Sequence, residues 1–189
     1  MKIMRLRSTI ARPADATAYA AGDEVSNSAS AGSVVRATFN MSGFRYGKIL
    51  AAEIDLTPAS GNVVTTAADF ELQIYRTSEV PAAVGDNVTN PISAVNRAKS
   101  IAIFRFDDTG WTGPLGTVAA GTSQHQAVGA HLVQPSATPS LQILFPAGYF
   151  FSLEDQTTKT FTAALRVLAA WTPTGIVNTF GITLDIEVE

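Results

Sequence analysis

Ser123 and His125 are the closest approach in this chain to a nucleophilic catalytic pair. On a strand they would share one face, because successive side chains of an extended chain point to opposite sides. A Ser–His nucleophile also needs an orienting carboxylate and an oxyanion hole, and neither has a signature here. The G-x-S-x-G turn of many hydrolases is missing as well. We therefore expect Ser123 and His125 to be polar loop residues and the protein not to be an enzyme.

A metal site is also poorly supported by the residue spacing. His125 and His131 are six positions apart, without a cysteine or carboxylate motif at metal-ligand spacing. Asp107-Asp108 closes an expected strand just before Gly110, which is typical of a turn, whereas calcium would require several more oxygen ligands. We expect no metal and no cofactor.

Aromatic residues offer a better case for binding. Trp111 lies between Gly110 and Gly113, where an indole could stack on a sugar ring, anchor a protein interface or fold back over the domain. Tyr19 lies between two turn signals near the N-terminus, and it is the stronger interface candidate of the two.

The composition of the 189 residues limits the classes of protein that fit. This length suits one sandwich or barrel domain. Only 15% of residues are charged, against about 25% in a typical domain, which indicates a surface covered by a partner or one rich in Ser and Thr. The net charge of −3 leaves no electrostatic footprint for nucleic acid. The lack of cysteine excludes disulfides and thiol catalysis, and no apolar run is long enough to predict a membrane span or a signal peptide.

Period-two alternation of apolar residues predicts most of the structure as strands. It is clearest from Phe180 to Val188, where Asp185 and Glu187 fall on the opposite, solvated face. Similar rows occur at 35–41, 50–56 and 161–171, and further strands are expected at 70–75, 101–106, 141–145 and 149–153. Pro146-Ala147-Gly148 predicts a hairpin-like turn between the last two of these.

Short strands separated by Pro and Gly indicate a sandwich, jelly roll or barrel. We expect an all-β, single-domain antiparallel β-sandwich of jelly-roll type, with an extended N-terminal arm and at most one short helix. That helix would have Asn90 as its cap, Pro91 in its first position and Ile92–Lys99 in its two turns. The segment 109–139 is a long loop with a weak strand at 118–120 or 127–133, and loops of this length are usually functional or disordered.

The segment from Arg12 to Val25 carries turn chemistry and a resemblance to a known family. It is similar to a leader of tailed-bacteriophage structural proteins with the pattern R-P-x-D-T-x-A-Y-x-A-G-D-x-V. The matching residues are Arg12, Pro13, Asp15, Ala18, Tyr19, Ala21, Gly22, Asp23 and Val25, with the threonine shifted to Thr17. The order that follows is also similar: the strand 70–75, Val80-Pro81, Gly85-Asp86-Asn87, then the strand 101–106. The stretch 87–100 departs from the family's acidic, helix-like segment.

The resemblance implies a virion structural protein without catalytic activity, built as a β-sandwich. We expect a capsid decoration or cement protein that binds the major capsid protein or another virion protein and forms a homo-oligomer, for instance a trimer. It would be made in the host cytoplasm and lie on the capsid surface. The alternative is a receptor- or carbohydrate-binding module of a tail or head fibre, which would use Trp111 and the loop 109–139.

Two segments follow from this interpretation: residues 1–30 as an N-terminal arm or edge-strand leader, and residues 31–189 as the β-sandwich domain. From spacing alone, an edge strand is the simpler alternative for the leader. The residues expected to contact a partner are Arg12, Pro13, Asp15, Tyr19, Asp23 and Trp111.

Overall fold

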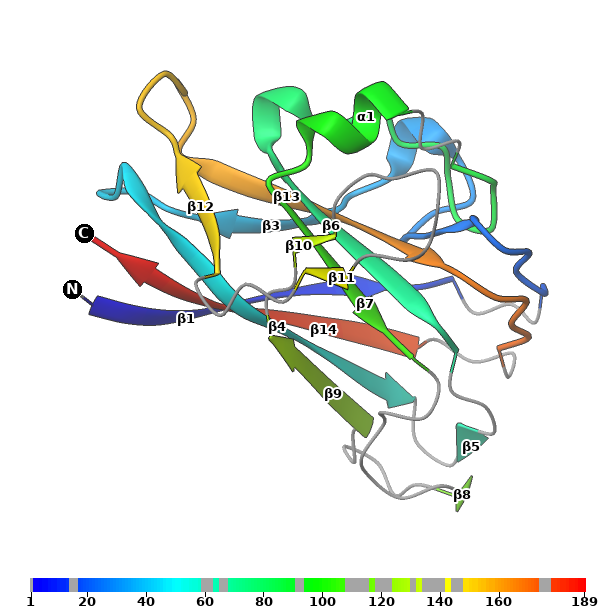
Figure 1. Ribbon diagram of the computed structural model, residues 1–189. Helices are drawn as coiled ribbons and strands as arrows, with labels where there is room; N and C mark the ends of the chain where they lie inside the picture. The colour runs from blue at the N-terminus through cyan, green and yellow to red at the C-terminus, as the bar shows by residue number, and fades with distance from the viewer. Residues whose placement is uncertain are drawn as a thin grey trace.

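Two antiparallel sheets share one hydrophobic core in the computed structural model (Figure 1). The structure describes residues 2–13, 17–58, 63–64, 68–90, 94–107, 116–117, 124–129, 132–133, 142–143, 148–173 and 178–189. The first sheet has the order β1 (Lys2–Ala11), β14 (Asn178–Val188), β4 (Tyr46–Pro58) and β12 (Tyr149–Ser152), with β9 (Gln124–Gly129) also paired with β4. The second sheet has the order β2 (Glu24–Val25), β13 (Thr160–Val167), β6 (Phe70–Arg76) and β7 (Ala102–Phe106), with β3 (Ala37–Asn40) also paired with β13.

Smaller elements complete the described structure. Two short ladders join β5 (Val63–Val64) to β8 (Gly116–Thr117) and β10 (Leu132–Val133) to β11 (Gln142–Ile143). The helical elements are η1 (Ala31–Ser33), η2 (Thr77–Glu79) and α1 (Ala94–Lys99). Within the described residues, no helix is long and apolar enough to cross a membrane.

The strand pairing is nested in the manner of a jelly roll. The outermost pair is β1 with β14, followed inward by β2 and β3 with β13, then β4 with β9 and β12, and finally β6 with β7. Successive pairs alternate between the two sheets, which is the jelly-roll arrangement of two interlocked Greek keys. The pairing brings Lys2 opposite Val188, so the two ends of the chain lie side by side (Figure 1). The predicted fold class is thereby confirmed.

The alternating rows of the sequence become the two inner faces of the sandwich. On β14 the side chains of Phe180, Ile182, Leu184, Ile186 and Val188 are at most 1% exposed. Aromatic rings from both sheets meet edge to face, for example Phe151 with Phe161 at 4.8 Å between centroids, a favoured geometry for such pairs. Trp171 is buried, as its place in the alternating row predicted. The strand itself ends at Val167, and Trp171 instead forms an isolated bridge with Tyr19.

Of three local expectations, one is wrong and two agree with the structure in part. The predicted hairpin between 141–145 and 149–153 is wrong, because β11 pairs with β10 whereas β12 pairs with β4. Pairing with β4 places Tyr149 and Phe151 in the hydrophobic core, which stabilises β12 at that position. The expected loop 109–139 contributes β9 to the first sheet, and β9 overlaps the weak strand expected at 127–133. The helix α1 lies within the predicted range, and its start lies outside the described residues.

Strand β6 is buried on both faces, which is unusual for a strand of a two-layered sandwich. Its inner face carries the apolar row Phe70, Leu72 and Ile74, as expected. Its outer face carries Glu71, Gln73 and Tyr75, each at most 1% exposed. These polar side chains contact one another, and Glu71 also contacts Arg97 of α1. The outer face of β6 therefore holds buried polar groups that hydrogen-bond within the protein.

Candidate functional site

A buried hydrogen-bond chain holds the leader against the sandwich. The hydroxyl of Tyr19 accepts a hydrogen bond from Arg12 Nε and donates one to Asp86 Oδ1, both at 2.6 Å. Its ring stacks on Trp171 at 5.4 Å between centroids. Burial raises the pKa of Tyr19 far above its ordinary value, and the hydrogen bond to Asp86 adds to this rise. The phenol therefore stays neutral and acts as a structural donor.

Backbone hydrogen bonds extend this contact into a strap between residues 22–26 and 86–90. Glu24 donates its N–H to the carbonyl of Val88 at 3.0 Å, and Asn87 donates to the carbonyl of Glu24 at 3.0 Å. The N–H of Ser26 donates to Asp86 Oδ1 at 2.9 Å. We call this arrangement, centred on Arg12, Tyr19 and Asp86, the leader lock.

Gly22 and Asp23 shape the turn that leads into the strap. Gly22 has a φ of +94°, which favours glycine. Asp23 Oδ2 accepts the N–H of Ala20 at 2.7 Å, and Asp23 Oδ1 accepts the hydroxyl of Thr89 at 2.8 Å. The two sequence segments that carry the resemblance, 12–25 and 85–87, thus meet in one structural unit.

The leader lock corrects the expectation that the leader presents side chains to a partner. Arg12 and Tyr19 are 1% exposed and Asp23 is 5% exposed, so all three contact their own chain. Arg12 and Tyr19 contact Asp86, and Asp23 accepts hydrogen bonds from Ala20 and Thr89, so exposing these side chains would break buried polar contacts. Pro13 is half-buried, whereas Asp15 and Trp111 lie outside the described residues. Residues 1–30 include β1, at one edge of the first sheet, and β2, at one end of the strand order of the second.

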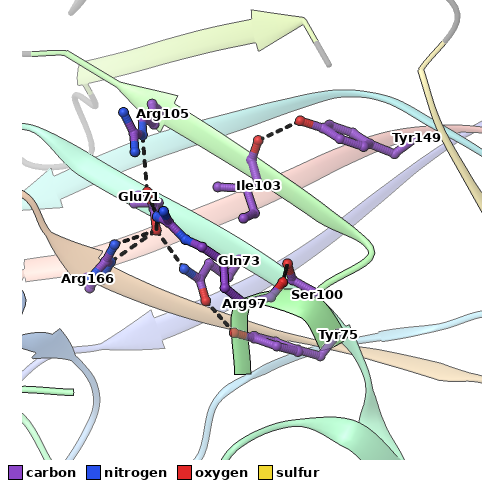
Figure 2. A network of polar contacts seen from close by, with 9 residues as sticks. All are labelled: Glu71, Gln73, Tyr75, Arg97, Ser100, Ile103, Arg105, Tyr149 and Arg166. Carbon is purple, nitrogen blue, oxygen red and sulfur yellow. Dashed lines mark hydrogen bonds and ion pairs between the residues drawn. The ribbon is translucent and has the colours of Figure 1, made fainter. Parts of the chain in front are cut away.

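The second polar cluster lies on the outer face of β6 and is shown in Figure 2. Glu71 is fully buried and accepts hydrogen bonds from three guanidinium groups. Arg97 Nη2 lies 2.9 Å from both carboxylate oxygens, Arg166 Nη2 lies 2.7 Å from Oε1, and Arg105 Nε lies 3.1 Å from Oε2. Gln73 donates to Oε1 at 2.6 Å. We call Glu71 with Arg97, Arg105 and Arg166 the arginine cluster.

Strand register explains why these side chains meet. Arg166 on β13 is opposite Glu71 on β6, and Glu71 is opposite Arg105 on β7. On its other side, Arg166 is opposite Glu24 of β2. Acidic and basic residues therefore alternate across four strands, which is the favourable cross-strand arrangement. Arg36 completes the row by contacting both oxygens of Glu24 at 2.7 Å.

The electrostatics of the cluster favour fixed charge over proton transfer. Burial alone would raise the pKa of Glu71, but Arg166, Gln73 and Arg97 together hold it below its ordinary value. Burial raises the pKa of the adjacent Tyr75 to about 12, and the Tyr75 hydroxyl hydrogen-bonds Gln73. Neither group can exchange a proton near neutral pH, so the cluster is suited to binding and to stability.

The catalytic and metal candidates of the sequence are not brought together in what the structure describes. His125 lies on β9 opposite Asp55 of β4, and nothing is described of its side chain. Ser123 and His131 lie outside the described residues. The described residues also contain no group of three His, Asp or Glu side chains that could hold a metal ion.

A shallow groove with two exposed aromatic residues lies at the start of β4, next to β12 and the end of β14. Its volume is about 260 Å³, and its lining includes Tyr46, Lys48, Phe150 and Glu187. Phe150 is 69% exposed and Tyr46 is 42% exposed. The Lys48 ammonium lies 4.9 Å from the centre of the Phe150 ring, within the range of a cation–π contact.

Sequence reasoning did not identify the arginine cluster. Glu71 alternates with apolar neighbours and so resembles an ordinary solvated position on a strand. The available signal was one charged residue on each of three expected strands, at positions 71, 105 and 166. That signal becomes specific only when the strand order and register are known.

Comparisons with known proteins show neither a family nor a function. No family model and no curated protein matches the chain. Among solved structures, the chain is similar to the decameric capsid protein of BFDV. The TM-score is 0.37, the identity is 11%, and the match covers 100% of this chain and 99% of that one. A Broad Bean Stain Virus structure matches with a TM-score of 0.33, 8% identity and coverage of 100% and 86%. A Cocksfoot mottle virus structure matches with a TM-score of 0.29, 10% identity and coverage of 100% of this chain and 93% of that one. At such low scores, the fold assignment rests on the strand pairing described above.

Proposed function

We propose that this protein is a structural component of a virus particle, and more specifically a capsid decoration protein that binds the major capsid protein. The observation that carries the proposal is the leader lock. The residues that resemble the phage leader and those of Gly85-Asp86-Asn87 are distant in sequence, yet they contact one another and attach the leader to the jelly roll. Both segments that resemble the phage family belong to one three-dimensional contact, and this makes the resemblance more specific than a match to a single linear pattern.

Binding alone would perform this function. A protein that binds the assembled shell but not its separated subunits stabilises the shell by mass action. The jelly-roll body supplies a rigid scaffold for this, and its exposed apolar side chains supply contact area. These include Ile3 on β1, Phe150 on β12 and Val95 on α1, each at least 65% exposed. Pro13, Asp15 and Trp111 remain partner-binding proposals, and a homo-oligomer, for instance a trimer, would place several such surfaces on one shell.

A receptor- or carbohydrate-binding module of a tail or head fibre is the second candidate. The groove beside Tyr46 and Phe150 favours it, because exposed aromatic rings can stack on sugars. Trp111 and the segment 109–139 would add to that surface under this alternative.

Purified particles test the main proposal most directly. We expect quantitative mass spectrometry to find the protein in many copies per particle, and electron microscopy with a specific antibody to place it over the shell. A few copies confined to the tail or fibres would favour the second candidate. Absence from the particle would refute both.

Binding to empty shells provides a complementary test. Deleting residues 1–25 is unsuitable here, because it removes β1, which pairs with β14 at ten positions, together with the leader lock. A better comparison is Phe150→Ser against the full chain, because Phe150 is exposed and its loss should leave the fold intact. Equal binding of both proteins to shells would exclude Phe150 from the interface.

A further inference from the structure

The arginine cluster carries more positive charge than its own carboxylate can balance. Three guanidinium groups contact the single carboxylate of Glu71, which leaves a surplus of two positive charges. The next acidic residue in the row, Glu24, is already engaged by Arg36 at 2.7 Å and by Asn90 Nδ2 at 2.7 Å. The surplus therefore persists when the whole cross-strand row is considered.

Hydrogen-bond donors in the cluster also exceed its acceptors. Each guanidinium has five N–H groups, whereas Glu71 offers two oxygens that already receive bonds from three arginines and Gln73. Arg97 Nε is a buried donor with no acceptor among the described residues. A buried donor without a partner is unfavourable, so the donors of the cluster are incompletely satisfied by the described residues.

The cluster is accessible from outside. The side chain of Arg105 is 48% exposed, that of Arg97 is 23% exposed and that of Arg166 is 18% exposed, whereas Glu71 is fully buried beneath them. An approaching ligand therefore meets guanidinium groups with the carboxylate behind them. Figure 2 shows Arg105 and Arg166 reaching Glu71 from neighbouring strands, with Arg97 joining them from α1.

Carboxylates are scarce in the segments that lie outside the described part of the chain. From Thr109 to Leu153 the sequence contains no Asp, Glu, Lys or Arg. Across all residues outside the described part, the acidic ones are Asp15 and Asp108 alone. The two described carboxylates that flank strands β6 and β7, Asp69 and Asp107, each take part in an interaction. A carboxylate from another molecule would balance the charge that remains on the cluster.

We propose that Arg97, Arg105 and Arg166 form a binding site for a carboxylate side chain of a partner protein. Guanidinium groups match carboxylates with paired N–H donors, and such charge-assisted bonds are stronger than neutral ones. A protein partner fits better than nucleic acid, because the basic patch is small and the chain has a net charge of −3. The inference goes beyond the virion role and stands without it, since it concerns binding by the isolated protein.

Isothermal titration at low ionic strength tests the proposal, with a hexaglutamate peptide as the probe. We expect saturable binding of this peptide and none of a hexaglutamine peptide. Arg105→Gln should weaken binding by about tenfold, the effect of losing one charge-assisted contact. Arg45→Gln, which removes an exposed arginine from the turn before β4, should bind as the unmodified protein does.

Two further measurements keep the result decisive. Circular dichroism establishes that each variant is folded, and Arg105→Lys, which keeps the charge but not the planar fork, should show intermediate affinity. Absence of peptide binding, or equal loss in the Arg45 and Arg105 variants, would overturn the site. Tighter binding of inorganic phosphate or of an oligonucleotide than of the peptide would overturn the assignment of the ligand as a carboxylate.

Discussion

Removing the hydroxyl group of Tyr19 should destabilise the protein far more than removing the hydroxyl group of Tyr46, which lies on the surface. In Tyr19→Phe the ring keeps its stacking on Trp171, so no cavity forms. The variant loses the hydrogen bond from Arg12 and the hydrogen bond to Asp86, both buried and both 2.6 Å long. The change therefore isolates the polar part of the leader lock.

The size of the effect follows from the contacts that are lost and kept. A hydrogen bond to a charged group contributes about 1.5–3 kcal/mol, and the variant loses two of them. Asp86 keeps the N–H of Ser26 at 2.9 Å, and Arg12 Nε remains 3.7 Å from Asp86 Oδ2, so part of the loss is recovered. We expect the free energy of unfolding to fall by about 2–4 kcal/mol.

Tyr46→Phe is the matched control, because the Tyr46 hydroxyl hydrogen-bonds Glu154 on the surface. It should leave the free energy of unfolding nearly unchanged, because the contact that it removes is exposed to solvent. Urea denaturation of the unmodified protein and the two variants measures both effects. An unchanged dependence of the free energy of unfolding on urea concentration shows that the same amount of surface is exposed on unfolding. Equal losses in the two variants would show that the leader lock does not stabilise the fold, and the reasoning would fail.

Further substitutions examine close packing within the sheets and the buried charge of Glu71. A Cβ at Gly47 would contact the backbone carbonyl of Glu187 and lie 2.8 Å from Phe151 Cζ, so Gly47→Ala should cost about 1–3 kcal/mol of stability. Gly32→Ala, where nothing lies within 4 Å, should stay within about 0.5 kcal/mol in the same thermal unfolding experiment, and similar values for both would contradict the clash. Glu71→Gln should cost about 3–5 kcal/mol, because three arginines lose their carboxylate. Since the pKa of Glu71 is lowered from 4.5, its contribution is complete above pH 4.5 and is lost as the pH falls through the folded-state value. When the free energy of unfolding is measured at several pH values, it should fall less steeply towards acid in Glu71→Gln than in the unmodified protein. Parallel pH curves for the two proteins would refute the role given to the Glu71 charge.

The strands were predictable because a single physical rule governs them. One face of each strand packs in the core, so apolar residues recur at every second position, as from Phe180 to Val188. The order of the strands could not be predicted from these rows, because it depends on pairing between segments that are distant in sequence. The hairpin at Pro146-Ala147-Gly148 failed because local turn signals do not report which strand offers the better core contact, and β12 gains that contact from β4.

Tyr19 illustrates a limit of a different kind. Turn residues on both sides made it resemble an exposed anchor. One hydroxyl partner, Arg12, is seven positions earlier, but the acceptor, Asp86, is 67 positions later. The pair of Tyr19 and Asp86 becomes visible only when the strap between 22–26 and 86–90 is formed. Buried polar residues are generally difficult to recognise in this way, because their partners are set by tertiary structure rather than by local pattern.

The leader lock and the arginine cluster are linked by the course of the chain. Segment 22–26 carries Glu24, which lies opposite Arg166 in the charged row, and segment 86–90 leads within a few residues to α1, which carries Arg97. Both halves of the strap thus place a charged residue beside the cluster around Glu71. The strap joins these two segments by backbone hydrogen bonds, so the segment that carries Glu24 and the segment that precedes α1 are held together at residues 22–26 and 86–90. The leader lock and the arginine cluster are thus built partly from the same two segments of the chain.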